Sequence, residues 1–417
     1  MSGPLLPPPS TPAPAAPPAL ARRGLWAIFI ATFCELVGYF MLMPWLLLQL
    51  KDGGESTALA GLFAASGWVG VFFMTPFASA ITQRLGRRPT LWLSALIPVV
   101  STTGFLLTDA LPVWFACEFI AGAASGLRWV LAEAVVAEFA PPHQRGRMVG
   151  LFETMVGTTF VIGPALLALV GPTSPVALWI VLCFLVLGLL GSLWIPRLPA
   201  AADAHEARVG LHGVWHALRA HPLIMTVGFV GGFFESGLTS ILPLYGLALG
   251  MGAAAAALLV SASGLGSALM MLPAGMAADR PSLQQRHGGE HGARVLILHA
   301  CALITLLATV LIPFVAGAPW LAAAVAFVWG GAGGSLYTLA MIDIGSREEG
   351  ITLVNSTAVL VLSYTLGGVL APALGAAMLD WAPVIGFPAL LLAVAGPGWW
   401  LLRREHRRLR SGRRGRA

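Results

Sequence analysis

Long apolar runs recur along the whole of the 417-residue chain and restrict its fold more than any other feature. Each run can cross the roughly 30 Å hydrocarbon core of a bilayer, which takes about 20 apolar residues in a helix. Only 10% of the residues are charged, whereas about 25% are charged in an ordinary soluble domain. We therefore predict an all-α membrane protein with twelve transmembrane helices. Their approximate ranges are 25–48, 58–80, 90–108, 112–138, 148–170, 174–196, 222–247, 252–278, 294–315, 319–344, 351–377 and 383–402.

The positive charges fall on one side of this pattern of spans. If the N-terminus is cytoplasmic, the Lys and Arg residues lie in cytoplasmic segments, except Lys51 in an outer loop and Arg128 inside a span. Cytoplasmic segments of membrane proteins carry an excess of Lys and Arg. We therefore expect both termini to be cytoplasmic.

One long cytoplasmic connection, 197–221, divides the spans into six and six. It contains RVGLHGVWHALRAH, whose apolar side chains fall mostly on one side of a helix, so we expect an amphipathic helix at the membrane surface. The spans on either side form bundles at 25–196 and 222–402. Beyond them, we expect a disordered, Pro- and Ala-rich cytoplasmic tail at 1–24. The basic tail at 403–417 is expected to bind anionic lipids rather than nucleic acid.

The fourth span, 112–138, is unusual because it carries four charged residues. A charge at bilayer depth costs about 2.5–3.5 kcal/mol on insertion scales, so this helix must face protein or water. Glu118, Arg128 and Glu133 share one broad face at 100° per residue, and we expect that face to line an aqueous cavity. Glu138 lies where the helix ends, and we interpret it as an interfacial residue.

The two bundles repeat one another in sequence. Phe33-Cys34-Glu35 in the first span is matched by Phe233-Phe234-Glu235 in the seventh, so a carboxyl group recurs about 200 residues later at the same depth. The ends of the second and eighth spans, and Pro residues in the fifth and eleventh, match in the same way. These matches in order indicate two homologous, pseudo-symmetric bundles.

The repeated motifs resemble the major facilitator superfamily over residues 25–402. In that family, the loop between the second and third helices runs Gly-xxx-Asp-Arg-x-Gly-Arg-Arg. The residues that match it are Arg84, Gly86, Arg87 and Arg88 in the first half and Gly275, Asp279 and Arg280 in the second. Ser79 and Gln83 stand where the family has Gly and Asp. The resemblance implies a cytoplasmic gate latch between helices, closed in the outward-facing state.

Two further family motifs are present in part. Glu118 stands where the family's fourth helix begins its motif with Arg, and Arg128 is the cation that could replace it. Gly163-Pro164 in the fifth span looks like a reduced antiporter signature, and Pro372 repeats it in the eleventh, so we expect helix bends there. The runs LRWVLAEAVVAEFAPPHQRGRMVGLFE and LPLYGLALG resemble a branch of bacterial transporters, which implies the plasma (inner) membrane of a bacterium.

A proton-driven transporter needs a group near mid-membrane that can gain and lose a proton, and a carboxyl group can do so. Our first candidates are Glu35 and Glu235, on the first helix of each bundle. Structural pairing of these acids is the alternative. The second set is Glu118, Arg128 and Glu133, for which a purely structural network is the alternative. The aromatic candidates for contact with a solute are Tyr39 and Trp129.

Three further acids are expected at the cytoplasmic ends of helices. We predict a salt bridge of Glu153 with Arg147, and an interfacial pair of Asp343 with Arg347. For Asp279, we predict pairing with Arg347 or with the start of the eleventh helix, where a carboxylate would favour the helix N-terminus.

These features together favour a secondary active transporter that moves a small organic solute by alternating access. We expect coupling to the proton gradient, prefer export and leave import open. A membrane sensor or scaffold that has lost transport, or a lipid-modifying enzyme, is the alternative. We expect no enzyme activity and no cofactor, because the outer loops are short and the sequence has no phosphate loop, GxSxG or HExxH motif. We expect no metal site, because the four cysteines lie in apolar spans without a CxxC pattern. We also expect a monomer.

Overall fold

The computed structural model describes residues 18–414 apart from 56, 172–173, 197–207, 252, 288 and 316. Most of the expected N-terminal tail and half of the linker therefore lie outside the described residues. The described part is built of helices and contains no strand. In the N-terminal half the helices are α1 (Pro18–Asp52), α2 (Thr57–Met74), η1 (Thr75–Phe77), α3 (Ala78–Leu85), α4 (Arg87–Leu107), α5 (Leu111–Phe139), η2 (Pro142–Gln144), α6 (Arg145–Val170) and α7 (Val176–Leu193).

The linker and the C-terminal half continue the helical pattern. Their helices are α8 (Gly210–Ala220), α9 (Pro222–Ser240), α10 (Leu242–Ala248), α11 (Ala253–Ala278), α12 (Pro281–His287), α13 (Glu290–Val315), α14 (Pro319–Gly345), α15 (Gly350–Trp381) and α16 (Gly386–Arg414). Ten helices in the described ranges are long and apolar enough to cross a membrane, or up to eleven if the bent pair α8 and α9 counts as one span. The chain is thus an all-α, multi-pass membrane protein, and the number twelve remains a prediction.

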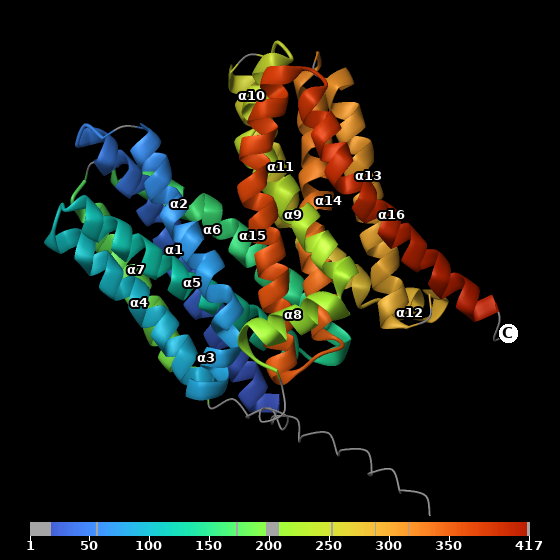
Figure 1. Cartoon of the computed structure of the whole chain (residues 1–417), viewed down its shortest axis with the longest axis horizontal. Helices are drawn as coiled ribbons and strands as arrows, with labels where there is room; N and C mark the ends of the chain where they lie inside the picture. The colour runs from blue at the N-terminus through green and yellow to red at the C-terminus, as the bar shows by residue number, and fades with distance from the viewer. Residues whose placement is uncertain are drawn as a thin grey trace, which may run out of the picture.

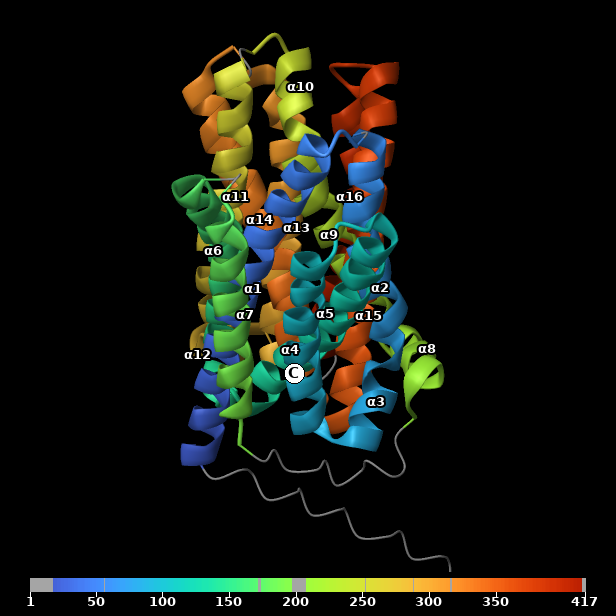
Figure 2. The same cartoon turned by 90° about the vertical axis from the view of Figure 1, so that its left-hand side faces the viewer.

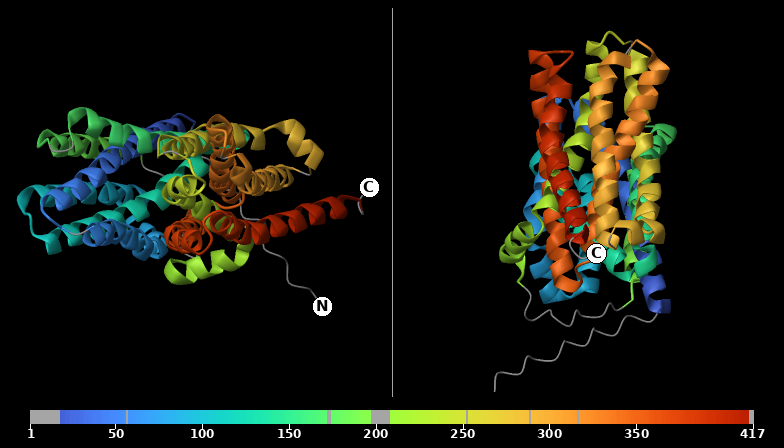
Figure 3. Two further views of the ribbon diagram at one scale, coloured as in Figure 1. Left: turned by 90° about the horizontal axis from the view of Figure 1, so that it is seen from above. Right: turned by 90° about the vertical axis from the view of Figure 1, so that its right-hand side faces the viewer.

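The two halves stand side by side, with α1–α7 on the left and α9–α16 on the right of Figure 1. Their ribbons converge at the end where α3 and α8 lie and diverge toward the opposite end, where α10 lies; Figure 2 shows the N-terminal half from its outer side. Seen from above, the halves lie next to each other along the long axis, and α8 follows one edge (Figure 3). Contacts between the halves include α6 with α11, and α15 with α3 and α5.

The buried apolar residues follow the same division. One core includes residues of both halves, among them Val135 of α5, Phe234 of α9 and Leu336 of α14. A second core is confined to helices of the N-terminal half and includes Leu46 and Phe63. Apolar packing therefore joins the two halves over part of their length, while elsewhere the N-terminal half is packed by itself.

The linker helix α8 has the amphipathic character expected of it. Its small residues Gly213 and Ala217 are buried, whereas Leu211 and Trp215 are more than half exposed. The axis of α8 turns by 97° from that of α9. A helix that exposes apolar side chains and runs across the direction of the spans has the geometry of an interfacial membrane helix.

Candidate functional site

The clearest polar cluster forms where the two halves meet, around Glu133 of α5. The hydroxyl of Tyr337, on α14 of the other half, lies 2.7 and 2.9 Å from the two carboxylate oxygens of Glu133. The indole Nε1 of Trp129 donates to Oε1 of the same carboxyl group at 2.5 Å. Glu133 is only 2% exposed. A buried hydrogen bond therefore links the N-terminal half to the C-terminal half.

A second carboxyl group lies against the first. The side chain of Glu153, on α6, is within hydrogen-bonding reach of Glu133, and it is only 6% exposed. Two ionised carboxylates in contact repel each other strongly in a buried site, so such a pair shares a proton. Glu153 thus lies beside Glu133 where the two halves meet. The predicted salt bridge with Arg147 at the cytoplasmic face was wrong, because six residues of helix, a rise of about 9 Å, separate Glu153 from Arg147 in the first turn of α6.

The C-terminal half adds a third carboxyl group and a second tyrosine. The hydroxyl of Tyr364, on α15, donates to Oε2 of Glu235, on α9, at 2.7 Å. Glu153 interacts electrostatically with both Glu133 and Glu235. We define the interface cluster as three residues from each half of the protein. Its members are Trp129, Glu133, Glu153, Glu235, Tyr337 and Tyr364.

The three aromatic rings of the interface cluster pack against one another. The centroid of Trp129 lies 6.2 Å from that of Tyr337 and 5.7 Å from that of Tyr364, and the two tyrosine rings are 5.0 Å apart. The rings are mutually inclined by 47–76°, the tilted geometry that aromatic pairs prefer. The carboxyl groups are thus held beside a packed aromatic group.

Arg128, only five residues from Glu133, has partners inside the N-terminal half. Its guanidinium forms an ion pair with Glu35 of α1 and donates to the hydroxyl of Ser192, on α7, at 3.0 Å. Arg128 and Glu35 are 3% and 4% exposed. Glu35 and Glu235 were predicted as equivalent acids, but the structure gives Glu35 a buried cation and Glu235 a tyrosine. Arg128 and Glu133, which share one face of α5, therefore belong to two separate sites.

Glu118 lies apart from both sites, toward the N-terminal end of α5. Its side chain is fully buried, and neither oxygen meets a hydrogen-bond donor among the described residues. A Cβ atom on Gly67 of α2 would lie 2.3 Å from Oε1 of Glu118, so a larger residue at this position would displace the carboxyl group. Tyr39 of α1 interacts electrostatically with this carboxyl group. An ionised carboxylate without donors is costly to bury, so we expect Glu118 to be neutral here.

At the end where the halves converge, Asp279 bridges them. Its carboxylate oxygens accept hydrogen bonds from the backbone N–H groups of Gly146 and Arg147, at 2.9 and 2.7 Å, where α6 begins. Burial raises the pKa of the Asp279 carboxyl above its ordinary value, although these two N–H donors act in the opposite direction. The predicted pairing of Asp279 with Arg347 or with the eleventh span was wrong, because the N-terminus it reaches is that of the fifth span.

A related contact lies on the other side of the same interface. Arg87 of α4 pairs with Glu138 of α5 at 2.7 Å, and Glu138 accepts a hydrogen bond at 3.3 Å from the backbone N–H of Gly350, where α15 begins. Glu138, interpreted from the sequence only as an interfacial residue, therefore connects the halves. Asp343 forms the expected pair with Arg347, at 2.6 Å, and also lies 3.7 Å from Arg294.

Comparisons with known proteins show the family of this chain. The family model described as "Major Facilitator Superfamily" matches residues 28–347. The chain belongs to the major facilitator superfamily. It is 24% identical over 345 residues to the MFS-type transporter YfkF of Bacillus subtilis (strain 168), covering 80% of this chain and 83% of that protein.

Solved structures of the superfamily share the fold. The human organic anion transporter MFSD10 (TETRAN) superposes with a TM-score of 0.73 at 18% identity, over 92% of this chain and 99% of that chain. The E. coli fucose:proton symporter FucP superposes with a TM-score of 0.71 at 14% identity, over 92% and 98%.

The residues that match the superfamily's gate motif differ in their exposure. Arg87, Gly275 and Asp279 lie in the contact between helices, whereas Arg84 and Arg280 are exposed. Gly86 has a positive φ of 84° between α3 and α4, a conformation that favours glycine. Arg88 packs over the ring of Trp92 at 4.4 Å.

Ser79 and the residues of the predicted bend motif also lie at contacts between helices or inside them. Ser79, which replaces the glycine of the superfamily's motif, accepts a hydrogen bond from the N–H of Gly210 at the start of α8, so it ties α3 to the linker. Gly163 lets α6 approach α1, since a Cβ atom there would lie 2.7 Å from the carbonyl carbon of Phe40. Pro164 and Pro372 lie inside the unbroken helices α6 and α15, and the predicted bends stay predictions.

Sequence reasoning missed three members of the interface cluster. Glu153 was placed too near the membrane surface, and Tyr337 and Tyr364 were not selected. The chain has only four tyrosines, and a phenol in the middle of an apolar span needs a hydrogen-bond partner. That rule could have selected Tyr337 and Tyr364.

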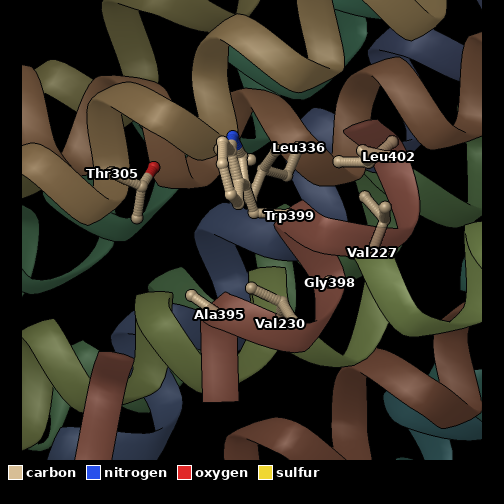
Figure 4. Close-up of a pocket in the computed structure, with 9 residues that line it drawn as sticks. Val227, Val230, Thr305, Leu336, Ala395, Gly398, Trp399 and Leu402 are labelled. Atoms are coloured by element: carbon tan, nitrogen blue, oxygen red, sulfur yellow. The ribbon is translucent and has the colours of Figure 1, made fainter. Parts of the chain in front are cut away.

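A small pocket within the C-terminal half is a poorer candidate. It lies between α9, α13, α14 and α16, and Figure 4 shows Val227, Leu336 and Trp399 among the side chains that line it. Thr305 brings a hydroxyl group, but the other lining residues are almost wholly apolar. A solute site needs several convergent polar groups to orient its ligand. The interface cluster meets this condition and the pocket does not.

Proposed function

We propose that this protein is a proton-coupled secondary active transporter that moves a small organic solute by alternating access. The observation that carries the proposal is the hydrogen bond from Tyr337 of one half to Glu133 of the other, next to Glu153. A proton shared by these two acids is held at the surface where the halves meet. Its binding and release are therefore linked to the separation of the halves.

Charge explains how protonation acts on the contact between the halves. With both Glu133 and Glu153 ionised, two adjacent negative charges are buried beside Glu235, and their repulsion favours separation and hydration of the acids. With a proton between them, the carboxyl groups keep their contact with Tyr337. Rocking of the halves then opens the cluster to one side of the membrane at a time.

The relatives support this proposal at the level of the family. FucP is named a fucose:proton symporter, and YfkF is named an MFS-type transporter. Export in exchange for protons is the direction that we propose, and it rests on the resemblance of Gly163-Pro164 to the antiporter signature. We further propose a bacterial plasma membrane location, a monomer, and contact of the basic tail with anionic lipids.

Transport by purified protein in liposomes tests the proposal. Vesicles loaded with the pH-sensitive dye pyranine are given a gradient of each member of a solute panel, and the internal pH is followed. We expect at least one solute to change the internal pH only when the protein is present. Glu133→Gln and Glu153→Gln should each reduce this signal at least tenfold, because each removes a partner of the shared proton.

Asp109→Asn is the matched control, since it neutralises an exposed carboxyl group just before α5 begins, about 33 Å of helix from Glu133, and should leave the signal unchanged. Solute movement that is independent of protons in the parent protein would overturn the proposed coupling. If no solute moves under any imposed pH gradient, the sensor or scaffold alternative is favoured instead.

A further inference from the structure

The charges of the interface cluster bear on the chemical class of the solute, an inference that rests on the proposed function. Glu133 and Glu153 form no ion pair with any Lys, Arg or His in the described ranges. Arg128 is the cation closest to them along α5, and its partner is Glu35. When the shared proton leaves, these two acids carry negative charge that no described side chain neutralises.

One carboxylate oxygen of the cluster has no hydrogen-bond donor other than the neighbouring acid. Oε1 of Glu153 is buried and, apart from the proton that Glu153 shares with Glu133, no N–H or O–H group of the described residues donates to it. Glu133, in contrast, receives bonds from Tyr337 and Trp129. A buried acceptor without a donor is rare in proteins, and a functional role or a bound water or ion is among its ordinary explanations.

The aromatic rings point to the same class of ligand independently. Trp129, Tyr337 and Tyr364 lie with centroids 5.0–6.2 Å apart and with their planes inclined to one another. The negative face of an aromatic ring attracts a cation within about 6 Å of its centroid, most strongly for Trp and when water is excluded. Aromatic rings beside carboxylates are the usual surroundings of a bound ammonium group.

We propose that the interface cluster binds an organic cation, an amine or quaternary ammonium that carries an apolar or aromatic body. The ammonium group occupies the space beside Glu153 and Glu235 when the bond between Tyr337 and Glu133 opens. The apolar body packs against Trp129 and the two tyrosine rings. Charge is balanced because the cation takes the place of the proton shared by the acids.

An anionic solute fits this arrangement poorly, because it would meet the carboxyl groups of Glu133 and Glu153, which pair with no cation in the described ranges. TETRAN is named an organic anion transporter. We therefore do not extend a preference for anions to this protein, although the two share a fold. Competition between a proton and a cation for one carboxyl group also gives exchange, since each displaces the other. This agrees with the proposed export driven by inward movement of protons.

Binding and transport of three probes test the inference. The probes are 1-methyl-4-phenylpyridinium (a permanent aromatic cation), benzoate (an aromatic anion) and fucose (a neutral sugar). Equilibrium binding to the purified full-length protein is measured at a series of pH values. We expect the pyridinium probe to bind more tightly than benzoate or fucose by at least tenfold. As the pH is lowered, the acids take up a proton that competes with the probe, so the affinity of the probe should then fall about tenfold per pH unit.

Two pairs of variants separate binding from folding. Tyr364→Phe keeps the ring and should bind the pyridinium probe with an affinity within about threefold of that of the parent. Tyr364→Leu removes the ring and should weaken binding about tenfold. Glu153→Gln should weaken binding and remove its pH dependence, while Asp109→Asn should change neither. Equal weakening by Tyr364→Phe and Tyr364→Leu would contradict the aromatic contact.

The inference and the proposed function fail in different ways. If benzoate or fucose binds and drives proton movement while the pyridinium probe does neither, the cation site is refuted and proton coupling stands. If the pyridinium probe binds with the stated dependence on Glu153 but moves no protons in vesicles, the cation site stands and the coupling is refuted.

Discussion

At the level of single residues, four of the membrane acids of this protein occupy three different surroundings. Glu35 has a buried Arg partner, Glu133 and Glu153 have each other, and Glu118 has no described hydrogen-bond donor. An ion pair holds its charge in place, whereas a pair of carboxyl groups must bind a proton to remain together. The Glu35–Arg128 pair is therefore suited to stability, and the Glu133–Glu153 pair to proton exchange.

The role of the Glu35–Arg128 pair can be measured by unfolding. Arg128→Met leaves the buried carboxylate of Glu35 without its cation and should lower the free energy of unfolding by about 3–5 kcal/mol. The double variant with Glu35→Gln should recover most of this loss. Unfolding of the purified protein in detergent by a denaturing surfactant gives the comparison. Losses that simply add in the double variant would show that the two side chains do not act as a pair.

At the level of elements, two helix N-termini meet carboxylates across the interface. Asp279, at the end of α11, receives N–H groups of α6, and Glu138, at the end of α5, receives the first N–H of α15. The unsatisfied N–H groups at a helix N-terminus attract an acceptor, so each contact joins a helix end in one half to the other half. Separation of the halves at this end requires both contacts to break.

The raised pKa of Asp279 predicts which substitution this contact tolerates. A carboxyl whose pKa is raised by burial stabilises the contact in its neutral form. This stabilisation is fully present below the ordinary pKa of about 3.9, and it is lost as the pH rises through the raised pKa. Asp279→Asn keeps a neutral acceptor, so it should keep the halves together and remove this pH dependence. Asp279→Ala removes the acceptor and should favour separation.

Distances between spin labels at Arg84 and Ser282, both exposed near this end, report the separation. The four native cysteines are first replaced so that only the introduced sites are labelled. If Asp279→Asn lengthens the distance as much as Asp279→Ala does, the ionised carboxylate is what holds the contact, and the direction argued here is wrong.

At the level of the whole molecule, α6 and α11 pack backbone to backbone between the halves. A Cβ atom on Gly275 would lie 2.0 Å from the carbonyl oxygen of Gly146, and one on Gly146 would lie 2.2 Å from that of Gly275. Small residues at a helix contact allow such close approach within membranes. The closed arrangement at this end of the protein therefore depends on the absence of two side chains.

Gly275→Ala should lengthen the distance between the same two labels, because the added methyl group cannot fit against the backbone of α6. The matched control is Gly264→Ala on the same helix, where a Cβ atom would meet nothing within 4 Å. It should leave the distance distribution unchanged. An unchanged distribution in Gly275→Ala would mean that the halves are separated in solution or that α6 shifts to make room.

The sequence alone predicted the class of fold and the family, and it did so for a physical reason. Backbone polar groups in lipid must be satisfied within the segment, so apolar runs of this length fold as helices. The match between Glu35 and Glu235 was likewise readable from order and spacing. Boundaries were less certain, as the break of the seventh span into α9 and α10 illustrates.

Only the tertiary structure decided which charges meet. Arg128 and Glu133 are five residues apart on α5, yet one reaches Glu35 within its own half and the other reaches Tyr337 of the opposite half. Helix periodicity places side chains on a face, but the partner depends on how neighbouring helices pack against it. The pairing of Glu133 with Glu153 is of this kind, because contacts between distant segments exist only once the helices are assembled.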